Sequence, residues 1–163
     1  MTDIALTRSE QDARAAAAVE HHHAEMAGTL TVRVTALLDA ASRGDTEAAA
    51  EARAELVRWL RSELVPHALA EEASLYVPAR RHPEGRLLVE GMLAEHRTIV
   101  GLVEALEQEG DPVRGAASAV ALRTAFESHL AKENDLVLPL LLADPEVSVA
   151  QLLGGMHELL GNE

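Results

Sequence analysis

The sequence predicts an all-α protein, an up-down-up-down four-helix bundle with a short C-terminal fifth helix. Apolar residues recur at spacings of three and four, and no stretch alternates apolar and polar residues as a half-buried strand does. Alanine and leucine supply most of the apolar content, and both favour helices. Because 163 residues can bury one core, we expect a single domain over residues 1–163, with the bundle at about 8–142 and the short terminal helix at about 146–160.

Local signals place the first two helices. Thr7 and Glu10 have the spacing of a capping box, which opens a first helix running to about Ser42. Gly44 ends this helix, and a second helix follows over about residues 46–77.

A proline lies inside the second helix. Pro66, directly before His67, has no backbone N–H, so it either kinks the helix and aims His67 into the core or separates two shorter helices. Both interpretations stay open. The third helix is expected at about 84–109 and the fourth at about 113–142, with Pro139 marking the fraying end of the fourth.

Polar residues that can bind metal interrupt the apolar stripe of each helix. Burying an unpaired carboxylate or imidazole costs on the order of several kcal/mol of folding free energy, and a bound metal would offset that cost. The stripe of the fourth helix steps by four and three through Leu122, Phe126, His129, Glu133, Leu136 and Leu140. The six candidate metal ligands on the four stripes are His23, His67, Glu71, His96, His129 and Glu133.

Residue counts place these six candidates at one height. In antiparallel neighbours, equal counts on the two sides of a turn mean equal heights. The first turn lies 21 residues after His23 and 22 before His67, the second 15 after His67 and 13 before His96, and the third 15 after His96 and 17 before His129. We therefore expect the six side chains to converge.

The pattern also occurs twice along the chain. A helix with one histidine precedes a helix with His-x-x-x-Glu, first as His23 with His67 and Glu71, then as His96 with His129 and Glu133. Two such hairpins, paired, would bring two carboxylates and four imidazoles to one centre. This is the ligand set of a dinuclear site with carboxylate bridges.

Other polar residues are expected outside this site. His21 and Glu25 share the four-residue spacing but point away from the stripe, which predicts a solvated pair. His22 competes with His23, and the three-residue spacing to Met26 favours His23. We expect Glu72 on the flank as a solvated carboxylate, Tyr76 more than two turns below the site, and both His82 and His157 at the surface without a partner.

These residues, in this order, resemble the hemerythrin-like family, also called HHE cation-binding domains. The resemblance covers about residues 15–140 and includes the flanking segments 65–78 and 94–96. It implies a non-haem di-iron centre with an oxo or hydroxo bridge, in which Glu71 and Glu133 bridge the irons and the four histidines are terminal ligands. Imidazole with carboxylate suits iron, with manganese or zinc as alternatives.

The chain departs from the oxygen-carrying members of that family at one place. Those proteins have a second histidine one turn before the position of His96, where this chain has Met92. The resemblance therefore implies six protein ligands and an open or water-filled position. Tight reversible dioxygen carriage is disfavoured, whereas sensing, iron storage and small-molecule redox chemistry remain open.

Composition limits partners and location. The net charge of −13 disfavours nucleic acid and anionic membranes as partners, and the absence of cysteine excludes disulfides and thiolate metal sites. The first residues do not form a signal-peptide pattern, and no apolar run approaches about 18 residues, so a cytoplasmic location is expected.

The leading functional hypothesis is a metal-binding protein whose di-iron centre binds or senses dioxygen, nitric oxide, peroxide or iron itself. A di-iron redox enzyme, of peroxidase or catalase type or acting in iron-centre repair, is the first alternative. No general base outside the ligand set is evident, which weighs against assigning a reaction. A metal-free helical interaction module is the second alternative. The pattern names no protein partner.

Overall fold

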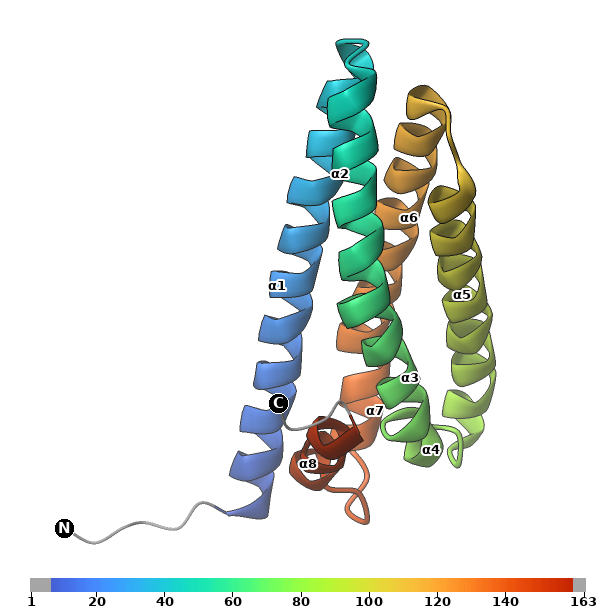
Figure 1. The fold of residues 1–163 in the computed structure, drawn as a ribbon. Helices are drawn as coiled ribbons and strands as arrows, with labels where there is room; N and C mark the ends of the chain where they lie inside the picture. The colour runs from blue at the N-terminus through green and yellow to red at the C-terminus, as the bar shows by residue number, and fades with distance from the viewer. Residues whose placement is uncertain (1–6, 160–163) are drawn as a thin grey trace, which may run out of the picture.

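The computed structural model describes residues 7–159, and every regular element in that range is helical (Figure 1). The all-α expectation is therefore confirmed. In chain order the elements are α1 (Arg8–Ser42), α2 (Thr46–Trp59), the π-helix η1 (Leu60–Leu64), α3 (Val65–Ala73), α4 (Tyr76–Ala79), α5 (Pro83–Gln108), α6 (Pro112–Lys132), the π-helix η2 (Glu133–Val137), α7 (Leu138–Leu142) and α8 (Val149–Leu159).

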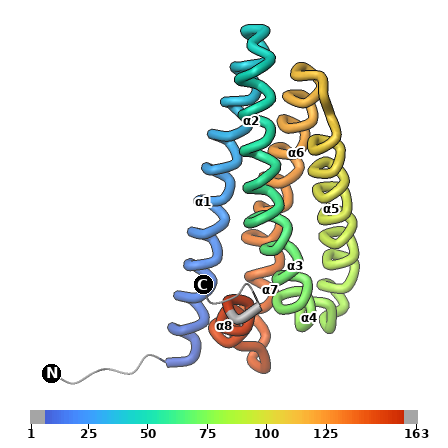
Figure 2. Tube along the Cα trace, in the orientation of Figure 1, coloured from blue at the N-terminus to red at the C-terminus, as the bar shows by residue number. Residues whose placement is uncertain are grey.

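Four long helical stretches lie side by side in both views (Figures 1 and 2). They are α1, α2 continued by η1 and α3, α5, and α6 continued by η2 and α7. The short helix α8 lies across one end of this group and packs against α1 and α3. Within residues 7–159, no helix is long and apolar enough to cross a membrane.

The predicted helix start is present in atomic detail. The Thr7 side chain accepts from the Glu10 backbone N–H at 3.3 Å, and the Glu10 carboxylate accepts from the Thr7 N–H at 2.8 Å. This is the reciprocal pair of a capping box. Gly44 has a φ of 70°, a left-handed conformation that ends α1 at little steric cost to glycine.

The π-helix η2 changes the expected register of the fourth stretch. A π turn contains about one residue more than an α turn, so residues after η2 are rotated relative to a continuous α-helix. Leu136, expected on the buried stripe, is 50% exposed, and Leu140 is only partly buried. Val137 and Leu141 are fully buried in their place.

Prolines follow both π-helices closely. Pro66 lies in the first turn of α3, directly after η1, and the chain stays helical from Thr46 to Ala73. The interpretation as two separate helices is wrong, because the π turn accommodates the missing N–H. Pro139 likewise lies in the first turn of α7, after η2. It does not mark a fraying end, since α7 continues to Leu142.

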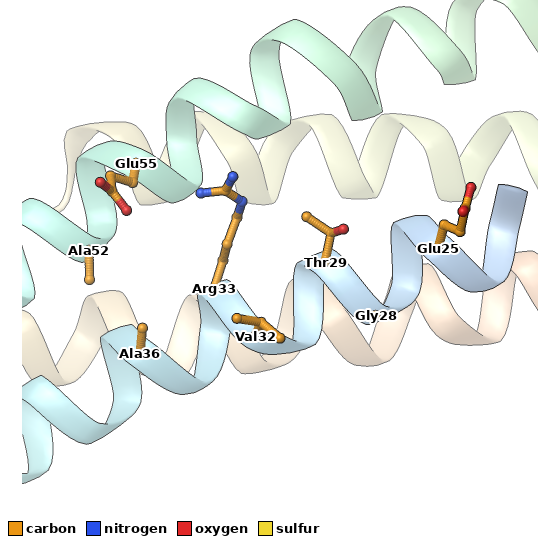
Figure 3. A pocket seen from close by; sticks show the side chains of 8 residues that line it. All are labelled: Glu25, Gly28, Thr29, Val32, Arg33, Ala36, Ala52 and Glu55. Carbon is orange, nitrogen blue, oxygen red and sulfur yellow. The ribbon is translucent and has the colours of Figure 1, made fainter.

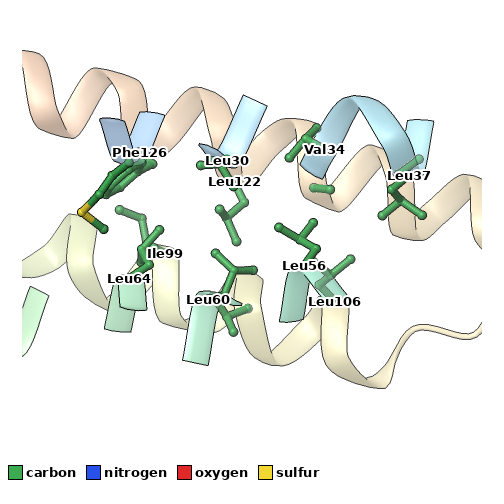
Figure 4. Close-up of a cluster of buried hydrophobic side chains, with 14 of the residues drawn as sticks. Leu30, Val34, Leu37, Leu56, Leu60, Leu64, Ile99, Leu106, Leu122 and Phe126 are labelled. Carbon is green, nitrogen blue, oxygen red and sulfur yellow. The ribbon is translucent and has the colours of Figure 1, made fainter. Parts of the chain in front are cut away.

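Two apolar clusters enclose a polar layer. The larger cluster fills the end of the molecule nearest the α1–α2 and α5–α6 turns and includes Leu30, Leu60 and Phe126 (Figure 4). The smaller cluster lies nearer α4 and α8 and includes Val19 and Met92. On α1, His23 falls between Val19 of one cluster and Met26 of the other. The predicted metal ligands are thus bounded by hydrophobic core on both sides.

Asp12 fastens α8 to α1. Its Oδ1 atom accepts hydrogen bonds from the Ser148 hydroxyl at 2.8 Å and from the Ala150 N–H at 2.9 Å. The carboxylate therefore acts as an N-terminal cap supplied by another helix. Burial works to raise the pKa of Asp12, but the hydrogen bonds from Ala150 and Ser148 outweigh it and lower the pKa below 3.8.

Asp12→Ala is expected to destabilise the protein by about 1 kcal/mol, because α8 loses its cap. Thermal unfolding at neutral pH should show a melting temperature roughly 2–4 °C lower. Because the folded-state pKa is depressed, the stabilisation is present above pH 3.8 and is lost as the pH falls through the lower folded-state value. A variant as stable as the parent at neutral pH would mean that the cap contributes nothing.

Candidate metal centre

The structure brings together all six side chains that sequence reasoning selected. None is more than 4% exposed, although they come from four different helical stretches. Their ligand-capable atoms form two overlapping groups within 4.8 Å, one of Glu71, His96, His129 and Glu133, the other of His23, His67 and Glu71.

Glu71 lies between three of the histidines. Its Oε1 atom is 2.8 Å from His67 Nε2 and 3.2 Å from His23 Nε2. Its Oε2 atom faces the other way and is 3.8 Å from His96 Nε2. The two oxygens of one carboxylate therefore face two different histidine pairs.

Glu133 spans the same two sides. Its Oε2 atom is 3.7 Å from His23 Nε2, and its Oε1 atom is 3.3 Å from His129 Nε2. The histidines pair accordingly, with ring centroids 5.4 Å apart for His23 and His67 and 4.4 Å apart for His96 and His129. Each half of the cluster offers two imidazoles and one oxygen from each carboxylate.

Unsatisfied buried atoms indicate that this donor set fits a metal. Both ring nitrogens of His67 and the Oε2 atom of Glu133 have no hydrogen-bond partner within residues 7–159. His67 Nε2 is close to Glu71 Oε1 but is not aligned for a hydrogen bond. Buried polar groups without partners are rare, and a cation among imidazole and carboxylate donors would satisfy all but the outer His67 nitrogen.

Without metal, protons on imidazoles compensate part of the carboxylate charge. Burial works to lower the pKa of His23, but the hydrogen bond and charge of Glu71 outweigh it and raise the pKa. His129 follows the same logic with Glu133, so its pKa is also raised. Burial works to raise the pKa of Glu71, but the charge of His67 and the hydrogen bond from His23 hold that pKa well below its usual range.

Three of the four histidines are oriented from outside the cluster. The Nδ1 atoms of His23, His96 and His129 each face an oxygen acceptor, which directs each Nε2 atom inward. The acceptors are Asn134 Oδ1 at 2.7 Å from His23, Glu72 Oε1 at 2.8 Å from His96 and Glu95 Oε2 at 3.1 Å from His129, with Glu95 also paired to Lys132. Glu72 is thus on the flank as expected, but it orients His96 rather than being simply solvated.

Tyr76 belongs to the site, and the expectation that it lies more than two turns below was wrong. Its hydroxyl donates a hydrogen bond to Glu133 Oε1 and is 3.2 Å from His129 Nε2 and 3.5 Å from His96 Nε2. The count along the second helix failed because α3 ends at Ala73 and the chain turns before α4. Burial, followed by the charge of Glu133, raises the pKa of the phenol, so it remains a donor.

Met92 is buried one helical turn before His96 and contributes no further nitrogen. The phenol of Tyr76 stacks against His96, with ring centroids 5.5 Å apart. The half of the cluster with His96, where oxygen carriers have an additional histidine in place of Met92, is therefore flanked by the Tyr76 hydroxyl group.

Some of the remaining histidines lie as the sequence predicted, and others do not. His21 is exposed and lies 3.4 Å from Glu25, the predicted solvated pair. His22 is exposed, whereas His23 faces the carboxylates, as preferred. His82 does have a partner, since its Nε2 atom is 2.9 Å from Asp144 Oδ2, which ties the α4–α5 turn to the segment before α8. His157 is exposed, but it lines a cavity shared with His22 and His67.

A wider groove of about 740 Å³ lies between α1 and α2 (Figure 3). Gly28, Arg33 and Ala52 line it, and none of the six cluster residues does. The Arg33 guanidinium lies 6.0 Å from the Trp59 ring, and its Nε atom has no hydrogen-bond partner in the described part of the chain. The groove is therefore separate from the cluster of six candidate metal ligands.

An all-helical protein with a buried cluster of four histidines and two carboxylates has the architecture of a helical metal-binding domain. The model of the hemerythrin HHE cation-binding domain matches residues 14–141 of this chain. The chain therefore belongs to the hemerythrin HHE cation-binding family. Neither a curated protein nor a solved structure matched it.

Proposed function

We propose that this chain is a single up-down-up-down four-helix bundle that holds a carboxylate-bridged di-iron centre in the cytoplasm. The centre binds dioxygen, nitric oxide or peroxide, or senses iron itself. Iron is proposed, with manganese or zinc as alternatives, because imidazole donors with carboxylates suit iron and the matching family model is that of a cation-binding domain.

One observation carries the proposal of two ions. The oxygens of Glu71 are divided between the His23–His67 pair and the His96 side, and those of Glu133 between His23 and His129. A single ion would leave one oxygen of each carboxylate and one imidazole pair without a cation. Two ions, one at each histidine pair, would use every inward-facing donor.

A bound iron pair would supply one- and two-electron redox chemistry toward small oxygen and nitrogen species. The protein supplies the rest. The apolar clusters on either side exclude bulk water, and Asn134, Glu72 and Glu95 fix the inward direction of the imidazoles. The Tyr76 hydroxyl holds a proton at Glu133 Oε1, next to His129.

Tyr76 also favours the second candidate function, a di-iron redox enzyme of peroxidase type. It is a buried hydrogen-bond donor outside the six-residue ligand set, a group that the sequence alone did not reveal. A positioned hydrogen-bond donor that stabilises developing negative charge accelerates such reactions by roughly 10²–10³-fold.

Absorption spectra of iron-loaded protein separate the two functions. Exposure to dioxygen, nitric oxide or peroxide should change the visible absorption of the loaded protein, whereas protein without metal should show no change. Peroxide removal over many turnovers would assign the enzyme, and a stoichiometric change would assign the binder. Identical spectra with and without all three ligands would contradict both.

Tyr76→Phe is expected to keep the metal and the fold while slowing any peroxide turnover by roughly 100-fold, because the hydrogen bond donated by the phenol is lost. The measurement pairs iron content with the rate of peroxide loss. Trp59→Phe is the matched control, since Trp59 packs against the larger apolar cluster away from the six ligands. Equal rates in both variants would exclude a catalytic role for the Tyr76 hydroxyl.

A further inference from the structure

One of the four histidines is held differently from the others. Each outer oxygen acceptor is the sequence neighbour of a cluster residue, so Asn134 follows Glu133, Glu72 follows Glu71 and Glu95 precedes His96. His22 is likewise the sequence neighbour of a cluster residue, His23. The His22 ring contacts the fourth histidine, His67, edge to face, with ring centroids 5.1 Å apart. No outer oxygen acceptor holds His67, because its Nδ1 atom has no hydrogen-bond partner among residues 7–159.

A cavity of about 140 Å³ lies at this histidine, under α8. His22, His67 and His157 line it together with the Met156 thioether and apolar side chains, and no arginine or lysine does. His22 and His157 are exposed, whereas His67 is 2% exposed. The cavity therefore joins two solvent-exposed imidazoles to a buried one, and the Nε2 atom of the buried ring lies 2.8 Å from Glu71 Oε1.

We propose that this cavity is a loading site for a divalent transition-metal cation, which His22 and His157 hold before it passes the ring of His67 into the cluster. The inference rests on the proposed function, because a loading site needs a centre to supply.

The chemistry of the lining selects a cation of this class. Imidazole is a ligand for iron, zinc and other divalent transition metals, and a thioether favours softer ions over magnesium or calcium. The chain carries a net charge of −13, so the surrounding field attracts cations. Two exposed imidazoles bind more weakly than the buried cluster, which lets the ion move inward.

The position of His67 suits transfer. The other three histidines are fixed by oxygen acceptors on their outer nitrogens, so their rings cannot rotate without breaking a hydrogen bond. His67 has no such restraint. His157 lies on α8, beyond the residues 14–141 that match the family model, so the match does not cover this part of the cavity.

Stopped-flow absorption with Co²⁺ tests the proposal on metal-free full-length protein. His22→Ala and His157→Ala are each expected to fill about tenfold more slowly than the parent. The final content is set by the four histidines and two glutamates of the centre. His21→Ala is the matched control, because His21 is exposed, paired with Glu25 and does not line the cavity. Both variants filling at the parent rate would overturn the proposal.

His157→Ala guards against indirect damage, since α8 contributes no residue to the cluster. A second measurement isolates the loading site. Glu71→Gln with Glu133→Gln removes both carboxylates, and Co²⁺ titration of that protein should retain about one weak site per chain that adding His22→Ala abolishes. If this protein has no residual Co²⁺ site while the parent fills normally, the loading site is overturned and the proposed function is not. A parent that takes up no Co²⁺ would overturn the proposed function as well.

Discussion

Glu133→Ala and His129→Ala are each expected to lower the bound iron from about two ions to less than about one ion per chain. Each variant removes a donor from the half of the cluster formed with His96. The loss should be large, because removing only an outer partner of a ligand already weakens binding by about 10–100-fold. Iron content after identical expression and purification is the measurement.

Two matched histidine variants serve as controls. His21→Ala and His157→Ala should keep the iron content of the parent, because neither residue is in the buried cluster. Circular dichroism should show that all four variants remain helical. Equal iron occupancy in all four would show that the cluster does not bind the metal.

Removal of the metal is expected to lower the melting temperature by roughly 10 °C, the second large effect. A ligand that binds only the folded state stabilises it by about 3–4 kcal/mol when present at 100–1,000 times its dissociation constant. For a domain of this size, each kcal/mol changes the melting temperature by roughly 2–4 °C. Thermal unfolding of chelator-treated and iron-reloaded protein measures the difference.

The metal-free protein should still fold, because the cluster compensates part of its own charge. The raised pKa values of His23 and His129 and the lowered pKa of Glu71 favour protonated imidazoles beside an ionised carboxylate. Apolar clusters on both sides remain intact. Reloaded protein that melts at the same temperature as metal-free protein would show that the cluster is satisfied without metal, as an interaction module requires.

Local patterns and residue counts predicted the main features of the fold and the cluster. The capping box at Thr7, the end of α1 at Ser42 and the convergence of six buried polar side chains all follow from helical periodicity and turn positions. This worked because each polar residue interrupts an apolar stripe, where burial without a partner is costly.

The failures have a common physical cause. Counting residues assumes a uniform α-helix, and η2 adds a residue to the turn, so Leu136 became exposed. Likewise, α3 ends before Tyr76 and the chain turns, which places the Tyr76 hydroxyl at the cluster of candidate metal ligands. Helix propensity does not report π turns, although a proline follows each of them closely, Pro66 after η1 and Pro139 after η2.

The outer acceptors could not be read from a stripe, because Glu72 and Glu95 are partly exposed and contact histidines on neighbouring helices. Asn134 likewise reaches from η2 to His23 on α1. Only their positions next to cluster residues in the sequence gave a signal.

Metal analysis of the purified chain after expression with added iron tests the central claim most directly. We expect about two iron ions per chain, since each carboxylate presents one oxygen to each histidine pair. A total metal content at or below about 0.2 per chain, in protein that is folded and helical, would contradict a dinuclear centre.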